Sequence, residues 1–178
     1  MKEIIAPLAL NQDQIISYHI ENPDNHAYGY IRRWNWLNLM LGLFIDRKKF
    51  LVSSDDGWTR FNHMLVNGKP YGGLVGNAAG FIRYLQAILR REEPFTHQLV
   101  ENMWKPGITN NGQPIRRGLA WLRGDLNGKP YFMHTGGAAN YYCEMHIYPD
   151  DNRASMIMTN NTGISGQNYL NRIDSLLF

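Results

Sequence analysis

The part of the chain after Pro114 has the rhythm of antiparallel strands, and this constrains the fold more than any other feature. Residues 118–123 and 129–134 flank residues 125–128, which end in Asn127-Gly128 and predict a hairpin turn. Residues 141–148 alternate between two faces, one with Tyr141, Cys143, Met145 and Ile147, the other with Tyr142, Glu144, His146 and Tyr148. Residues 154–159 are almost continuously apolar, which is typical of a strand covered on both faces.

Residues 1–113 are predicted to be mainly helix and loop. Asn77 is a suitable N-cap for a helix whose apolar positions follow at spacings of three and four: Phe81, Tyr84, Leu85 and Ile88. A second helix fits residues 96–104, and another fits about 167–177 after the strands. Residues 1–178 therefore predict a single α+β domain, in which an antiparallel sheet (within 114–178) is flanked by helices.

Residues 34–45 are strongly apolar and lie between two basic clusters, Arg32-Arg33 and Arg47-Lys48-Lys49. The segment is too short to span a bilayer, which takes about 20 residues. It fits a buried helix or cleft cover, a protein interface or, least favoured of the three, contact with a membrane surface. We therefore expect it to be buried.

Composition narrows the function classes. The net charge is +3 and the other basic residues are scattered, so we expect no nucleic-acid partner. Cys143 is the only cysteine and is expected to be a small core residue. His146 is expected to be exposed or stacked between tyrosines. Glu144 and His146 lack a third ligand at a plausible spacing, so we expect neither a metal site nor another cofactor.

The segment His134-Thr135-Gly136-Gly137 is the best candidate for a functional site. A hydroxyl and two glycines at the end of an apolar strand let a substrate backbone approach closely, as acyl-transfer chemistry requires.

Four stretches, in order, resemble the serine β-lactamase and penicillin-binding-protein family, in particular the branch with class C β-lactamases, esterases and D-amino-acid peptidases. They are residues 5–10, the Tyr71-Gly72-Gly73 segment with its following helix, His134-Thr135-Gly136-Gly137, and the region 148–161. The match corresponds to roughly the C-terminal half of the sequences in this family. It implies an incomplete β-lactamase/transpeptidase-like fold, without the N-terminal strands and the nucleophile helix.

The resemblance also implies roles for the candidate residues. His134 stands where the family has Lys or His, and Thr135 would offer its hydroxyl to the substrate. Gly136 would allow close approach, and the N–H of Gly137 would be one of two oxyanion-hole donors. Thus His134 and Gly137 are the expected catalytic residues, and Thr135 and Gly136 the expected substrate-binding residues. Asn140 stands where the branch has glycine and is expected to be left-handed.

The family's nucleophile is a serine with lysine three positions later, and no serine of this chain has that partner; they are Ser17, Ser53, Ser54, Ser155, Ser165 and Ser175. We therefore expect part of a serine hydrolase acting on an amide, ester or lactam, inactive alone. Whether this chain is itself an enzyme stays open. The alternatives are a non-catalytic binding module and one subunit of a split enzyme.

The resemblance implies partners as well. The family's N-terminal strands pair beside its last strand, here 154–159, so this edge is expected to be open. An N-terminal half or a homo-oligomer would cover it, and a small or peptide-like substrate would bind the complete enzyme. Family members are often periplasmic or extracellular, but the chain opens without a signal peptide and its compartment is undecided.

Overall fold

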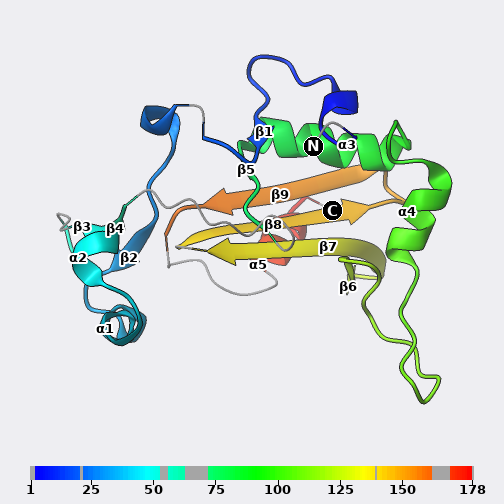
Figure 1. The fold of residues 1–178 in the computed structure, drawn as a ribbon. Helices are drawn as coiled ribbons and strands as arrows, with labels where there is room; N and C mark the ends of the chain where they lie inside the picture. The colour runs from blue at the N-terminus through cyan, green and yellow to red at the C-terminus, as the bar shows by residue number, and fades with distance from the viewer. Residues whose placement is uncertain are drawn as a thin grey trace.

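The structure is a computed structural model of the chain, and it describes residues 3–20, 22–52, 56–62, 72–138, 140–161 and 169–177. Its centre is a four-stranded antiparallel sheet in the order β6-β7-β8-β9 (Figure 1). The strands are β6 (Leu122–Leu126), β7 (Lys129–Ala138), β8 (Tyr141–Tyr148) and β9 (Arg153–Thr159). This confirms the α+β fold class with an antiparallel sheet.

The hairpin between β6 and β7 is tighter than the sequence predicted. Asn127 and Gly128 both have positive φ, at 55° and 82°, and Leu126 pairs with Lys129. This is the two-residue turn that Asn-Gly favours. Strand β6 runs from Leu122 to Leu126. The predicted strand at 118–123 therefore lies too early in the sequence. Asn140, between β7 and β8, has φ 65° and confirms the expected left-handed conformation.

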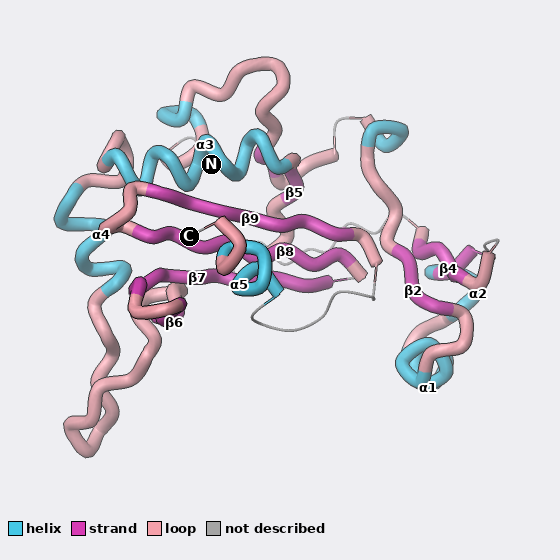
Figure 2. Tube along the Cα trace, turned by 180° about the vertical axis from the view of Figure 1, so that it is seen from behind, coloured by secondary structure: helices cyan, strands magenta, loops and turns pink. Residues whose placement is uncertain are grey.

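Helices lie along one edge and one face of this sheet. Helix α3 (Ala78–Arg90) runs along β9, followed by α4 (His97–Trp104), while α5 (Tyr169–Asp174) covers the back of the sheet (Figures 1 and 2). The predicted cap is present, since the Asn77 side chain accepts a hydrogen bond from the Gly80 N–H at 2.9 Å. The helix predicted at 167–177 is shorter at its C-terminal end, where Ser175 to Leu177 form turns.

The main core lies between α3, α4 and the sheet. Leu85 and Ile88 from α3 are fully buried with Ile147 of β8. Trp104 of α4 stacks on Phe132 of β7, with ring centroids 4.2 Å apart. The 3-10 helix η1 (Ala6–Leu8) adds the buried Leu8. These residues cover one face of β8, and α5 packs against the other.

A second lobe stands apart from the four-stranded sheet, on the left of Figure 1. It contains β2 (Tyr30–Arg32), β3 (Leu51–Val52) and β4 (Trp58–Phe61) in the order β2-β4-β3, with α1 (Trp36–Phe44) and α2 (Arg47–Phe50). The smaller elements are β1 (Ile16–Ser17) paired with β5 (Val75–Gly76), and the 3-10 helix η2 (Pro23–Asn25).

The expectation that residues 34–45 are buried is wrong. Trp34 is 90% exposed, and Leu43 and Phe44 of α1 are 75% and 78% exposed. The apolar composition predicted burial, but among the residues of α1 whose exposure is described the buried one is the polar Asn38.

Candidate active-site wall and the polar cluster behind it

The candidate segment lies where β7 extends beyond β6. The pairing of these strands ends at Leu122 and Met133, while β7 continues to Ala138. On its other side this extension pairs with β8 up to Ala138 and Tyr141. Within the described residues no strand pairs with the outer edge of His134 to Ala138. The backbone groups along this edge can therefore accept an added extended chain.

The four candidate residues are presented to solvent to different degrees. His134 and Gly137 are exposed, and Thr135 and Gly136 are half-buried. The His134 ring meets Trp121 edge to face, with centroids 6.2 Å apart. We call the stretch from His134 to Gly137 the β7 wall.

The two glycines of the β7 wall have different surroundings. A Cβ on Gly136 would lie 3.3 Å from Cys143 Sγ, which is a tight contact. A Cβ on Gly137 would lie no closer than 3.5 Å to any other atom, the nearest being the Tyr141 carbonyl oxygen. Packing against described residues therefore does not require glycine at 137, which leaves room in front of this residue for a ligand.

A polar cluster is buried behind the β7 wall, between β8 and α5. His146 is fully buried with two carboxylates: its Nδ1 lies 2.8 Å from Asp174 Oδ2 and its Nε2 lies 3.0 Å from Glu144 Oε1. Because each ring nitrogen faces a carboxylate oxygen, this geometry suits a doubly protonated imidazolium, which donates on both sides.

Other donors complete the two carboxylates. Asp174 Oδ2 also accepts from the Tyr148 hydroxyl at 2.7 Å and the Ser155 hydroxyl at 2.9 Å. Glu144 Oε2 accepts from the Tyr142 hydroxyl at 2.9 Å and from the Leu170 N–H at 3.3 Å. The cluster therefore joins two strands to α5 through charge-assisted hydrogen bonds.

Burial and these hydrogen bonds act in opposite directions on the pKa of Asp174. Burial raises it, but the hydrogen bonds from His146, Tyr148 and Ser155 outweigh burial, so the pKa of Asp174 is lowered. Burial and the hydrogen bond to Asp174 raise the pKa of the Tyr148 phenol. The carboxylate is thus the favoured form of Asp174.

One residue of the cluster lies opposite the β7 wall. Thr135 pairs with Glu144 across β7 and β8, so these two side chains share a face of the sheet. The sequence did not predict the cluster, because Asp174 is 28 positions from His146 and lies on a different element. Of the two alternatives expected for His146, exposure or stacking between tyrosines, the structure shows the second: the buried ring stacks on Tyr131 at 4.5 Å and meets Tyr148 edge to face at 6.1 Å.

The carboxylates of the cluster lie on opposite sides of the His146 ring. Among the described residues no group of three His, Cys, Asp or Glu side chains could hold a metal ion. Cys143 is only partly buried, and burial raises the pKa of its thiol. A reactive cysteine needs the opposite shift.

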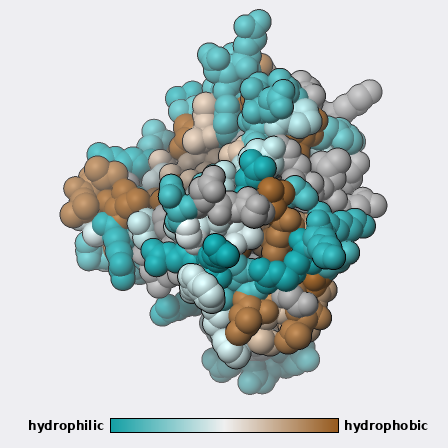
Figure 3. Space-filling view, turned by 90° about the vertical axis from the view of Figure 1, so that its left-hand side faces the viewer, coloured by the Kyte–Doolittle hydropathy of each residue, from teal (hydrophilic) through white to brown (hydrophobic). Residues whose placement is uncertain are grey.

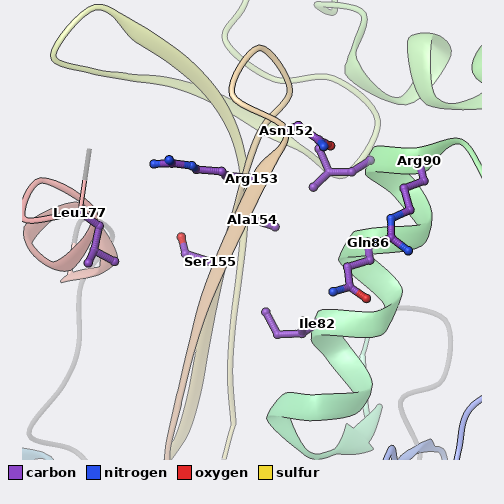
Figure 4. Close-up of a pocket in the computed structure, with 9 residues that line it drawn as sticks. Ile82, Gln86, Arg90, Asn152, Arg153, Ala154, Ser155 and Leu177 are labelled. Atoms are coloured by element: carbon purple, nitrogen blue, oxygen red, sulfur yellow. The ribbon is translucent and has the colours of Figure 1, made fainter.

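A groove of about 520 Å³ lies beside β9, between α3 and the end of the chain (Figure 4). Figure 4 shows Ile82, Gln86 and Arg90 of α3 on one side and Leu177 on the other. Strand β9 is the last in the sheet order, and no described strand pairs with its outer edge. This edge is therefore unpaired among the described residues, as expected, although α3 runs along it.

Comparison with solved structures shows a similar fold in the octameric penicillin-binding protein homologue from Pyrococcus abyssi, with a TM-score of 0.69 and 16% sequence identity. The chain has a penicillin-binding-protein-like fold. The similarity covers 99% of this chain and 36% of that chain, so this chain corresponds to about a third of the homologue's length. No protein-family model matches the chain, and no curated protein does.

Some residues of the sequence argument cannot be placed. Tyr71, Ser53, Ser54 and Ser165 lie outside the described residues. Ser155, by contrast, is described, and its hydroxyl donates a hydrogen bond to Asp174 within the polar cluster. At this level of identity the similarity establishes the fold, and the roles of His134, Thr135, Gly136 and Gly137 stay predictions.

Proposed function

We propose that this chain supplies the substrate-facing wall of an acyl-transfer cleft in a β-lactamase-like serine hydrolase. The observation that carries the proposal is the unpaired edge of β7 from His134 to Ala138. Gly137 lies within this edge and is exposed. A peptide-like substrate would add to this edge as a further strand. Its acyl oxygen would then lie near the Gly137 N–H, one of two donors of the oxyanion hole.

The other side chains of the β7 wall would orient the substrate. The exposed His134 would supply a positive or hydrogen-bonding group near the substrate carboxylate, and Thr135 would donate its hydroxyl. The nucleophile would come from outside this sequence, because no serine here has lysine three positions later. The chain alone should therefore bind such substrates weakly and turn none over.

Two measurements test the proposal. Nitrocefin and p-nitrophenyl esters should show no turnover with the purified chain, and intact-mass spectrometry should show no acyl-serine adduct. An acyl-D-alanyl-D-alanine peptide should shift the backbone amide resonances of Thr135 and Gly137 in a 15N NMR titration. Steady turnover with an adduct would disprove the inactivity, and unchanged resonances along β7 would disprove the substrate wall.

A matched pair of variants makes the binding test specific. Gly137→Ala adds a methyl group where the protein leaves space, so it should weaken peptide binding while the free energy of unfolding changes little. Gly128→Ala changes a glycine at φ 82° in the β6–β7 turn, so it should lower stability and leave binding unchanged. The reverse pattern would count against a ligand at Gly137.

The open edge of β9 favours a second candidate function, that of one subunit of a split enzyme. The groove between α3 and Leu177 would receive a strand of the complementing half, which pairs with β9 and carries the nucleophile. The DNA upstream of Met1 distinguishes the cases. Ser-x-x-Lys and Tyr-x-Asn in frame indicate a truncated hydrolase; in a neighbouring frame they indicate a split protein; their absence leaves a non-catalytic binding module.

A further inference from the structure

The outward face of α1 and the residues before it form an apolar surface that the β7 wall does not explain. Its members are all more than half exposed: Trp34, Trp36, Leu39, Leu43 and Phe44. Hydrophobic side chains gather over the lower part of the face shown in Figure 3, where this lobe lies. Several exposed hydrophobic side chains on one lobe in this way mark an interaction site.

The orientation of α1 is fixed by a polar anchor. Asn38 is 1% exposed, and its Nδ2 donates to the carbonyl oxygens of Arg32 and Arg33 at 3.2 and 3.3 Å, and to Thr59 Oγ1 at 3.3 Å. From α2, Arg47 donates to the Asn38 carbonyl oxygen at 2.6 Å. The helix thus turns its asparagine inward and its tryptophan and leucines outward, which is the reverse of a water-facing helix.

Cations flank this apolar helix in the sequence. Between Tyr30 and Asn62 the sequence has six Lys or Arg and three Asp. The net charge of this segment is therefore +3, the same as that of the whole chain. Arg32 and Arg33 precede α1, and Arg47, Lys48 and Lys49 follow it; all five are exposed. Asp46 caps α2 through the Lys48 N–H at 3.0 Å.

We propose that α1 is an interfacial helix that places its apolar face in the surface of an anionic lipid bilayer. Tryptophan, phenylalanine and leucine on one face with flanking cations are the features of such helices. Nine residues make a helix of about 14 Å, against a hydrocarbon core of about 30 Å, so α1 lies in the plane of the surface. Consistently, no helix in the described part of the chain is long and apolar enough to cross a membrane.

A second copy of the chain fits this surface less well. In a two-fold dimer through α1 the same patch meets itself, which brings the flanking cations of both copies together. Anionic headgroups instead neutralise Arg33, Lys48 and Lys49 while the tryptophans enter the acyl boundary. Charge complementarity therefore favours the lipid surface over self-association.

Vesicle flotation with the purified full chain tests the proposal. The chain should bind vesicles of phosphatidylcholine with about 30% phosphatidylglycerol and bind pure phosphatidylcholine much less. Binding should weaken between about 0.1 M and 1 M salt, over which the Debye length falls from about 10 to about 3 Å. Brominated acyl chains should quench tryptophan fluorescence, and Trp36→Phe should remove part of that quenching.

Two sets of variants separate the apolar and the charged contributions. Trp36→Ser and Phe44→Ser should each weaken binding about tenfold or more, and the exposed Leu119→Ser, far from α1 in the sequence, should not. Arg33→Gln and Lys48→Gln should each weaken it about fivefold. Lys105→Gln and Arg116→Gln each remove the same single charge from exposed positions outside the lobe and should have little effect. Circular dichroism checks that every variant is folded.

Three results would overturn the proposal. One is the absence of binding to the anionic vesicles. Another is binding that Trp36→Ser and Phe44→Ser leave unchanged while the variants remain folded. The third is a dimer in sedimentation velocity that these two substitutions dissociate, without vesicle binding, which would assign the face to a second copy.

Discussion

His146 of β8 and Asp174 of α5 are joined by a hydrogen bond of 2.8 Å between Nδ1 and Oδ2, with both side chains fully buried. With Glu144 on the other ring nitrogen, this bond holds the C-terminal helix on the face of the sheet that carries Thr135. The buried cluster and the β7 wall are therefore neighbours in the sheet.

Asp174→Ala should lower the free energy of unfolding by about 3–5 kcal/mol, because it removes one partner of a buried charged pair. The Tyr148 and Ser155 hydroxyls lose their acceptor at the same time. Urea denaturation followed by circular dichroism measures the change. The exposed Asp150→Ala is the matched control and should change stability by less than about 0.5 kcal/mol. Equal effects would contradict the role of the cluster.

The lowered pKa of Asp174 predicts how stability depends on acid. Since the pKa is lower folded than unfolded, its stabilisation is present above the unfolded value of about 3.9 and is lost as pH falls through the folded value. Urea midpoints measured from pH 7 downward should show this loss, and Asp174→Asn should reduce its steepness. An unchanged acid profile in the folded Asp174→Asn variant would contradict the prediction.

Tyr84 predicts a loss of stability in alkali. Burial raises the pKa of this phenol to about 12, and its ring meets Phe95 edge to face. The raised folded pKa means that its contribution is present below the unfolded value of about 10 and is lost as pH rises through 12. Ultraviolet titration should show a tyrosine ionising near pH 12. Tyr84→Phe should remove that step, whereas the more exposed Tyr169→Phe should not.

Gly80→Ala should destabilise the protein although alanine is the better helix former by about 1 kcal/mol. A Cβ at position 80 would lie 2.5 Å from the Ile15 carbonyl oxygen, a backbone atom, so β1 or α3 must move. We expect a net loss of about 1–3 kcal/mol in thermal or urea unfolding. Gly72→Ala meets no atom within 4 Å and is the control. A more stable Gly80→Ala variant would contradict the close approach.

Met158→Lys tests whether copies of the chain associate through the unpaired edge of β9. Met158 is exposed on this strand, and a lysine on an edge strand opposes pairing with another chain. If copies associate through β9, sedimentation velocity should show less association for the variant at unchanged stability. Leu119→Lys, at an exposed position outside the sheet, is the control. Identical association of both variants and the original chain would place any interface elsewhere.

Local sequence determined the elements whose causes are local. Asn77 caps α3, Asn127-Gly128 turns the β6–β7 hairpin, and Asn140 takes the left-handed conformation. Alternation along 141–148 placed His146 and Glu144 on one face, because side chains of a strand alternate whatever surrounds it. The resemblance implied that no strand of this chain would pair beyond 154–159, and none does among the described residues.

Tertiary structure decided what depends on distant partners. Whether a strand histidine is exposed or buried depends on what covers that face, and here α5 brings Asp174 to it. The apolar sequence of α1 predicted burial, yet the hydrogen bonds of Asn38 turn this helix outward. Composition shows how apolar a segment is, but only the packing of the whole chain decides which face of that segment is buried.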